Sequence, residues 1–156
     1  MPNPKVFAAA LSLSEALPLL VPSTASASKV ADFRSPAAAA QVIRDYYAAI
    51  DRGNFRAAYA AWARGGRASG KSYANFRAGF ASTASSRVVP GAPTNGDGAA
   101  GSIFVDIPVD VIATLKNGRR QHFRGRYTLR RVNDVDGATP AQLHWHIESA
   151  KLLVAR

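Results

Sequence analysis

The chain has 156 residues, with 20 Lys and Arg against 10 Asp and Glu, a net charge of +10 and no Cys. This length suits one domain with its own core, and the lack of Cys excludes disulfides, thiolate metal sites and cysteine nucleophiles. No apolar run reaches the roughly 18 residues of a membrane-spanning helix, so we expect a protein that does not span a membrane. The excess of positive charge favours an anionic partner or surface.

The first 27 residues have the pattern of an export signal. Lys5 supplies a positive start, Val6–Val21 is mostly apolar, and Ala25-Ser26-Ala27 fits a small-x-small cleavage site. The alternative is an amphipathic or disordered extension. The pattern predicts a periplasmic or secreted protein. The predicted divisions are a signal peptide at 1–27, a linker at 28–34 and one domain at 35–156.

Three amphipathic helices are predicted next. Ser35-Pro36 supplies an N-cap and a first-turn proline, and the apolar spacing that follows predicts a helix over 36–51. Asn54 can cap a second helix and Ser72 a third. The apolar residues of these two helices are Phe55, Ala58, Tyr59 and Trp62, and then Tyr73, Phe76 and Phe80.

The rest of the chain has the pattern of strands. A short strand is predicted at 85–90, and residues 102–115 alternate apolar and polar side chains, which indicates a long half-buried strand. Asn117-Gly118 is a hairpin turn signal, and 119–131 is the expected return strand. Glycine and proline predict loops at 91–101 and 132–142. The last strand is expected at 143–154.

The length of the hairpin link decides which side chains share a face. A three-residue link places Ile107 opposite Tyr127 and makes one face wholly apolar, whereas a two-residue link pairs apolar residues with acids. The three-residue register therefore directs Asp110 and Arg124 to a polar, basic outer face. Continuing this register to the last strand places residue 143 opposite 131 and Glu148 opposite Arg126, with a bulge or strand end at Lys151.

Helices on one face of an antiparallel sheet define an α+β fold. We expect three N-terminal helices on a curved antiparallel sheet of four or more strands. The segments 42–55, 58–59 and 125–130 resemble the nuclear-transport-factor-2-like superfamily, and the resemblance covers about 36–154. It implies a cone-shaped fold whose interior often holds a small apolar ligand. This superfamily includes ketosteroid isomerase, polyketide cyclases, carriers and interaction modules, so the fold alone does not give the function.

The first candidate site is the interior of this cone. Seven aromatic side chains are expected between helices and sheet: Tyr46, Trp62, Phe76, Phe80, Phe123, Tyr127 and Trp145. They either surround a ligand pocket or fill a closed core. The resemblance also suggests an acid–base site, for which Asp45 with Tyr46 are the only, weak catalytic candidates. The alternative for Asp45 is a solvated helix residue.

The second candidate site is an anion- or partner-binding face of the sheet, formed by Arg124, Arg126, Arg130, His144 and His146. The alternative is an ordinary solvated face. The spacing of His144 and His146 would suit two metal ligands on one strand, but His122 is expected far from them and the arginines repel a cation. We therefore predict no metal and no cofactor.

These observations lead us to expect an exported, non-catalytic binding domain with an apolar cone for a small hydrophobic ligand. One alternative is an isomerase-, cyclase- or dehydratase-type enzyme that uses the cone. Another is an envelope adaptor that binds an anionic component or an acidic protein through the arginine face. No nucleic-acid motif is present, and a monomer and a homodimer both remain open.

Overall fold

The computed structural model describes residues 32–94 and 96–156. The predicted signal peptide at 1–27 and residues 28–31 of the predicted linker lie outside the described residues. The elements in chain order are the helices α1 (Pro36–Asp51) and α2 (Phe55–Ala60), the 3-10 helix η1 (Arg67–Ser69), α3 (Tyr73–Ala78), the strands β1 (Thr83–Pro90), β2 (Gly98–Ala99), β3 (Ser102–Leu115) and β4 (Arg120–Val132), the helix α4 (Pro140–Leu143), and β5 (His146–Val154).

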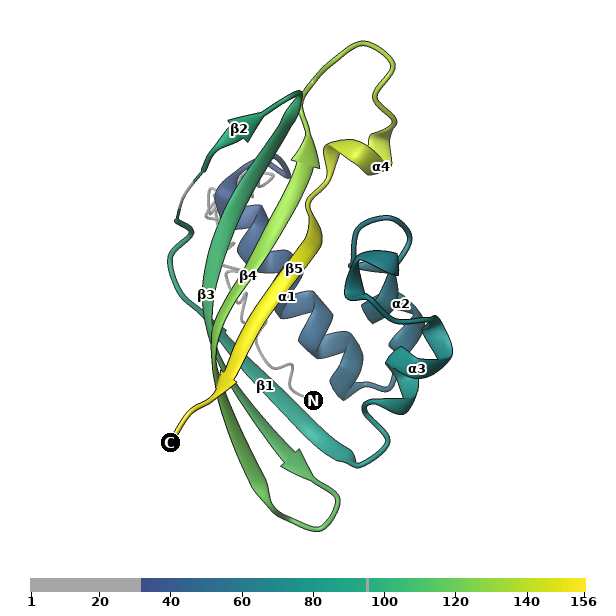
Figure 1. Ribbon diagram of the computed structural model, residues 1–156, viewed down its shortest axis with the longest axis vertical. Helices are drawn as coiled ribbons and strands as arrows, with labels where there is room; N and C mark the ends of the chain where they lie inside the picture. Colours follow the sequence, from purple (N-terminus) through teal and green to yellow (C-terminus); the bar gives the residue numbers. More distant parts are fainter. Residues whose placement is uncertain (1–31, 95) are drawn as a thin grey trace, which may run out of the picture.

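The strands form an open antiparallel sheet of five strands in the order β1-β3-β4-β5, with the short β2 also paired to β3. In Figure 1, α1 runs along the sheet, and α2 and α3 lie together beside the half of the sheet nearest the β3–β4 turn. The fold is therefore α+β, as predicted.

The three-residue link between β3 and β4 is confirmed. Leu115 N–H donates to the carbonyl of Arg119 at 2.8 Å, and Gly118 has a φ of 83°, the left-handed conformation that this link requires. Ile107 lies opposite Tyr127 and Val111 opposite Phe123. The apolar side chains of both long strands consequently share one face.

The predicted register of β5 is wrong. Arg126 lies opposite Lys151 rather than Glu148, and a bulge falls between Ile147 and Ser149. In a regular strand Ile147 and Lys151 would share a face, because side chains alternate. The extra residue, Glu148, allows Ile147 to be fully buried while Lys151 is exposed.

β5 also begins later than predicted. Thr139 and Gln142 form a capping box that starts α4, with Pro140 in its first turn. Residues 140–143 are therefore helical, and His144 is the residue that ends this helix. The pair Thr139-Pro140 could have predicted this helix, since the same combination of a hydroxyl cap and a proline starts α1 at Ser35-Pro36.

The core lies between α1 and the inner face of the sheet. Its largest fully buried side chains are Ile43, Val105, Ile107, Leu129 and Ile147. Ser35 caps α1 by accepting a hydrogen bond from Ala38 N–H at 3.2 Å. Between residue 32 and the C-terminus, no helix that the structure describes has the length and apolar character to cross a membrane.

Gly125 allows β4 and β5 to approach closely. A Cβ built at this position would overlap the carbonyl oxygen of Lys151 and lie 2.9 Å from Cα of Leu152. Only glycine fits against the neighbouring backbone at this distance. The residues of β5 that follow the bulge therefore depend on Gly125 for their position.

Candidate functional site

The main cleft of the protein lies between the helices and the inner face of the sheet. Its volume is about 510 Å³, within the range of small-molecule sites. Seven aromatic residues line it: Tyr46, Tyr47, Trp62, Phe76, Phe80, Phe123 and Tyr127. Phe123 continues this aromatic wall along β4, and Val111, Ala113, Ala150 and Leu152 supply aliphatic surface from the sheet.

Six of the seven residues predicted for the pocket lie in the lining of this cleft: Tyr46, Trp62, Phe76, Phe80, Phe123 and Tyr127. The seventh, Trp145, does not. It is buried at the other end of α1, where its Nε1–H donates to the carbonyl of Ser35 at 2.9 Å. Trp145 is buried in the core, as its predicted direction requires, but it packs against the start of α1 and is not among the residues that line the cleft.

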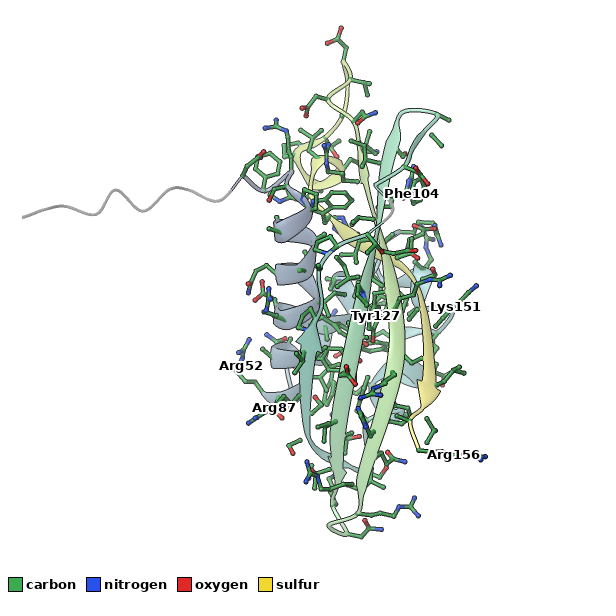
Figure 2. All side chains as sticks on the ribbon, turned by 90° about the vertical axis from the view of Figure 1, so that its left-hand side faces the viewer. Arg52, Arg87, Phe104, Tyr127, Lys151 and Arg156 are labelled. Carbon is green, nitrogen blue, oxygen red and sulfur yellow. The ribbon has the colours of Figure 1, made fainter. Side chains whose placement is uncertain are left out.

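Tyr46 lies at the centre of the aromatic cluster. Its ring is 6.1 Å from the rings of Trp62 and Tyr127 and 5.0 Å from that of Tyr47, in edge-to-face arrangements. Such contacts are favourable and hold each ring in one orientation. Tyr127 lies on β4, in the central part of the sheet (Figure 2).

Two phenol groups meet inside the cluster. The hydroxyls of Tyr47 and Tyr127 are 2.7 Å apart and buried, and one of them donates to the other. Burial raises the pKa of Tyr47 to about 12 and also raises that of Tyr127 and of Tyr46. All three phenols are therefore protonated at neutral pH and can act as hydrogen-bond donors.

Among the residues that the structure describes, the lining contains no carboxylate and no histidine, and Lys71 is its single charged side chain. Asp45, the weak candidate base, is exposed on α1 and accepts a hydrogen bond from Gln41 at 2.9 Å. It is not among the residues that line the cleft. The arrangement can hold an apolar molecule and donate hydrogen bonds to it, but no described residue of the lining is a carboxylate or a histidine that could act as a base.

Sequence reasoning did not find Tyr47, Lys71 or Gln121 as cleft residues. Tyr47 belongs to the apolar stripe of α1 and could have been included. Lys71 follows Gly70, whose φ of 73° turns the chain at the end of η1. No periodic pattern places a residue of such a turn at the mouth of a cleft.

The predicted arginine face is only partly assembled. Arg124 lies 2.6 Å from Asp110 and Arg126 lies 3.5 Å from Asp106, while Arg130 donates two hydrogen bonds to Ser102 Oγ. These carboxylates lie on the outer face, as the register predicted. Hydrogen bonds from Arg124, and next from His122, lower the pKa of Asp110.

The two histidines of the arginine face are separated. His146 opens β5 opposite Arg130, but His144 lies outside the sheet, where its ring stacks on Phe33 at 4.4 Å. They do not form the one-strand pair that the sequence predicted, because α4 ends at His144. Within residues 32–94 and 96–156, no three His, Asp or Glu side chains are grouped as metal ligands would be.

No protein-family model, no curated protein and no solved structure matches the chain. The fold and the cleft therefore define the protein as an α+β domain with an open antiparallel sheet and an aromatic cleft between helices and sheet.

Proposed function

We propose that this protein is a non-catalytic binding domain that holds a small, mostly apolar ligand in the aromatic cleft. The observation that carries the proposal is a cleft of about 510 Å³ whose walls are aromatic and aliphatic and whose ionisable groups are three neutral phenols and one lysine. We also propose that the fold belongs to the nuclear-transport-factor-2-like superfamily, with the cleft as the interior of its cone.

The hydroxyl pair supports a ligand that carries a hydrogen-bond acceptor. One hydrogen of Tyr47 and Tyr127 is used in the bond between them. The hydroxyl hydrogen of the second tyrosine has no further partner within the part of the chain that the structure describes. An unused buried donor is costly, so a carbonyl or ether oxygen in the cleft would be favourable.

An enzymatic role is less well supported. Proton abstraction needs a base within hydrogen-bond reach of the substrate, and isomerases of this type use a carboxylate for it. Asp106 and Asp110 lie on the outer face of the sheet, and Asp45 is exposed on α1. The cleft therefore supports binding better than proton transfer.

Binding can be tested with the uncharged dye N-phenyl-1-naphthylamine, whose fluorescence rises in apolar surroundings. We expect saturable binding of one dye per chain. Ala113→Trp places a large side chain in the cleft and weakens binding by about tenfold or more. Ala37→Trp, at an exposed position of α1, is the control and leaves binding unchanged. Absence of saturable binding, or equal binding by both variants, would contradict the proposal.

We further propose that the protein is exported. The support is the pattern of a charged start, an apolar run and a small-residue cleavage site over 1–27. The intact mass of the protein recovered from a periplasmic or culture fraction tests this, and we expect the mass of a chain that starts at Ser28. A full-length chain confined to the cytoplasm would refute export.

A second candidate function is binding of an anionic surface by the outer face of the sheet. Arg126 and Lys151 lie directly opposite each other on neighbouring strands. Like charges in this position destabilise a sheet, and Asp106 offsets only part of the charge. An anionic partner would remove this cost.

Vesicles of phosphatidylglycerol and phosphatidylcholine in equal parts test this second function. We expect salt-sensitive binding that Arg126→Gln/Lys151→Gln removes. The matched control is Arg44→Gln/Arg52→Gln, which removes the same charge from two exposed positions, one on α1 and one at its C-cap. Figure 2 shows Arg52 on the α1 side and Lys151 on the opposite side. Equal loss in both double variants would show that only net charge matters.

A further inference from the structure

Lys71 is fixed at the cleft by its backbone. Its carbonyl accepts a hydrogen bond from the hydroxyl of Tyr59 at 2.7 Å, and its N–H donates to Ser69 Oγ at 3.3 Å. Gly70 turns the chain immediately before it. The two hydrogen bonds and the turn at Gly70 fix the backbone of Lys71, so its Cα has a defined position beside the cleft.

The ammonium group of Lys71 lies over the end of α3. A Cβ built on Gly79 would lie 3.8 Å from Nζ of Lys71 and 3.2 Å from the carbonyl oxygen of Phe76. The ammonium therefore lies beside Gly79, the residue that ends α3. The absence of a side chain at Gly79 leaves room for it.

The charge of Lys71 is not neutralised by a neighbour. Throughout the described ranges, no carboxylate lies within 4.0 Å of its ammonium, and no other charged residue lines the cleft. The other groups around it are apolar or neutral. The cleft is thus an apolar space with one cation and no anion.

We propose that the ligand of the cleft is an apolar monocarboxylic acid, whose carboxylate binds Lys71 and whose apolar body lies against the aromatic wall. This inference rests on the proposed binding function and adds the charge of the ligand. One lysine balances one negative charge, and its ammonium can donate a charge-assisted hydrogen bond to a carboxylate oxygen. The same lysine repels an amine.

Calorimetry with three matched probes tests the inference: 4-phenylbutanoate, its methyl ester and 4-phenylbutylamine. The probes share one body and differ in the charge of the head group. We expect the acid to bind about three- to fivefold more tightly than the ester, as suits a partly exposed ion pair. The amine is expected to bind most weakly. Added salt reduces the preference for the acid and does not change the affinity for the ester.

Three variants separate a binding role of Lys71 from a structural one. Lys71→Met removes the preference for the acid and leaves the affinity for the ester unchanged, while Lys71→Arg retains the preference. Lys116→Met makes the same substitution at an exposed position in the β3–β4 link and has no effect.

The outcomes also separate this inference from the proposed function. Equal binding of acid and ester by the native protein would overturn the inference and leave the cleft as a binding site. So would a preference that survives in Lys71→Met, or an equal loss of acid and ester in that variant. Failure of all three probes to bind would overturn the binding function itself.

Discussion

Replacement of Gly125 by alanine is expected to displace the end of β5. The added Cβ would overlap the carbonyl oxygen of Lys151 and lie 2.8 Å from its carbonyl carbon, whereas Cβ atoms essentially never approach other atoms more closely than 3.0 Å. Both contacts are with backbone, so no side chain can rotate to relieve them. Overpacking of this kind costs typically 1–3 kcal/mol, and we expect a loss of about 3 kcal/mol in the free energy of unfolding.

Urea denaturation of Gly125→Ala measures this loss, and dye binding measures its consequence. Ala150 and Leu152 line the cleft, so a shift of this strand also weakens binding of N-phenyl-1-naphthylamine. Gly96→Ala is the control, because a Cβ at Gly96 would have no atom within 4 Å and we expect a change of at most about 0.5 kcal/mol. Equal stability of the two variants would refute the close approach of β4 and β5 at Gly125.

Three further predictions concern the core, the phenol pair and the start of α1. Leu129→Ala empties a fully buried position and should cost about 2–5 kcal/mol in urea denaturation, whereas Leu153→Ala, at a position 77% exposed, should cost less than about 0.5 kcal/mol; similar costs would contradict the burial of Leu129. Burial raises the pKa of Tyr47 from an ordinary 10.0 to about 12 in the folded chain, so the contribution of this phenol to the free energy of unfolding is intact below pH 10 and is lost as the pH rises through 12, by roughly 3 kcal/mol. Unfolding free energies measured across this range should therefore fall less steeply in Tyr47→Phe, and an unchanged slope would argue against burial of this phenol. Ser35→Ala removes the cap of α1 and should lower stability by about 1 kcal/mol, with recovery in Ser35→Asp; no difference among the three proteins would exclude the capping role.

The parts of the fold that follow from a repeating pattern could be predicted from the sequence. The α1 boundaries and the β3–β4 register were predicted because many apolar residues support one answer in each case. A shift of the β3–β4 register by one residue would have exposed Val105, Ile107 and Leu129 together. Most of the aromatic residues of the cleft were found for the same reason.

The parts that depend on one local irregularity could not be predicted in this way. The pairing of β5 with β4 is shifted by two residues from the prediction where the strand starts, and the bulge at Glu148 adds a third, so the charge opposite Arg126 changes from negative to positive. The helix that ends at His144 changes the places of Trp145 and His146. Each of these irregularities depends on one or two residues. The alternation of apolar and polar side chains around them therefore does not predict them.

The short segment around Trp62 joins the helices to β5 through backbone hydrogen bonds. Ala63 N–H donates to the carbonyl of Ile147, and Ile147 N–H donates to the carbonyl of Ala61, each at 2.8 Å. Separation of the helices from the sheet at this end would break both hydrogen bonds and expose the buried ring of Trp62. The Trp62 end of the cleft is thus tied directly to the backbone of β5.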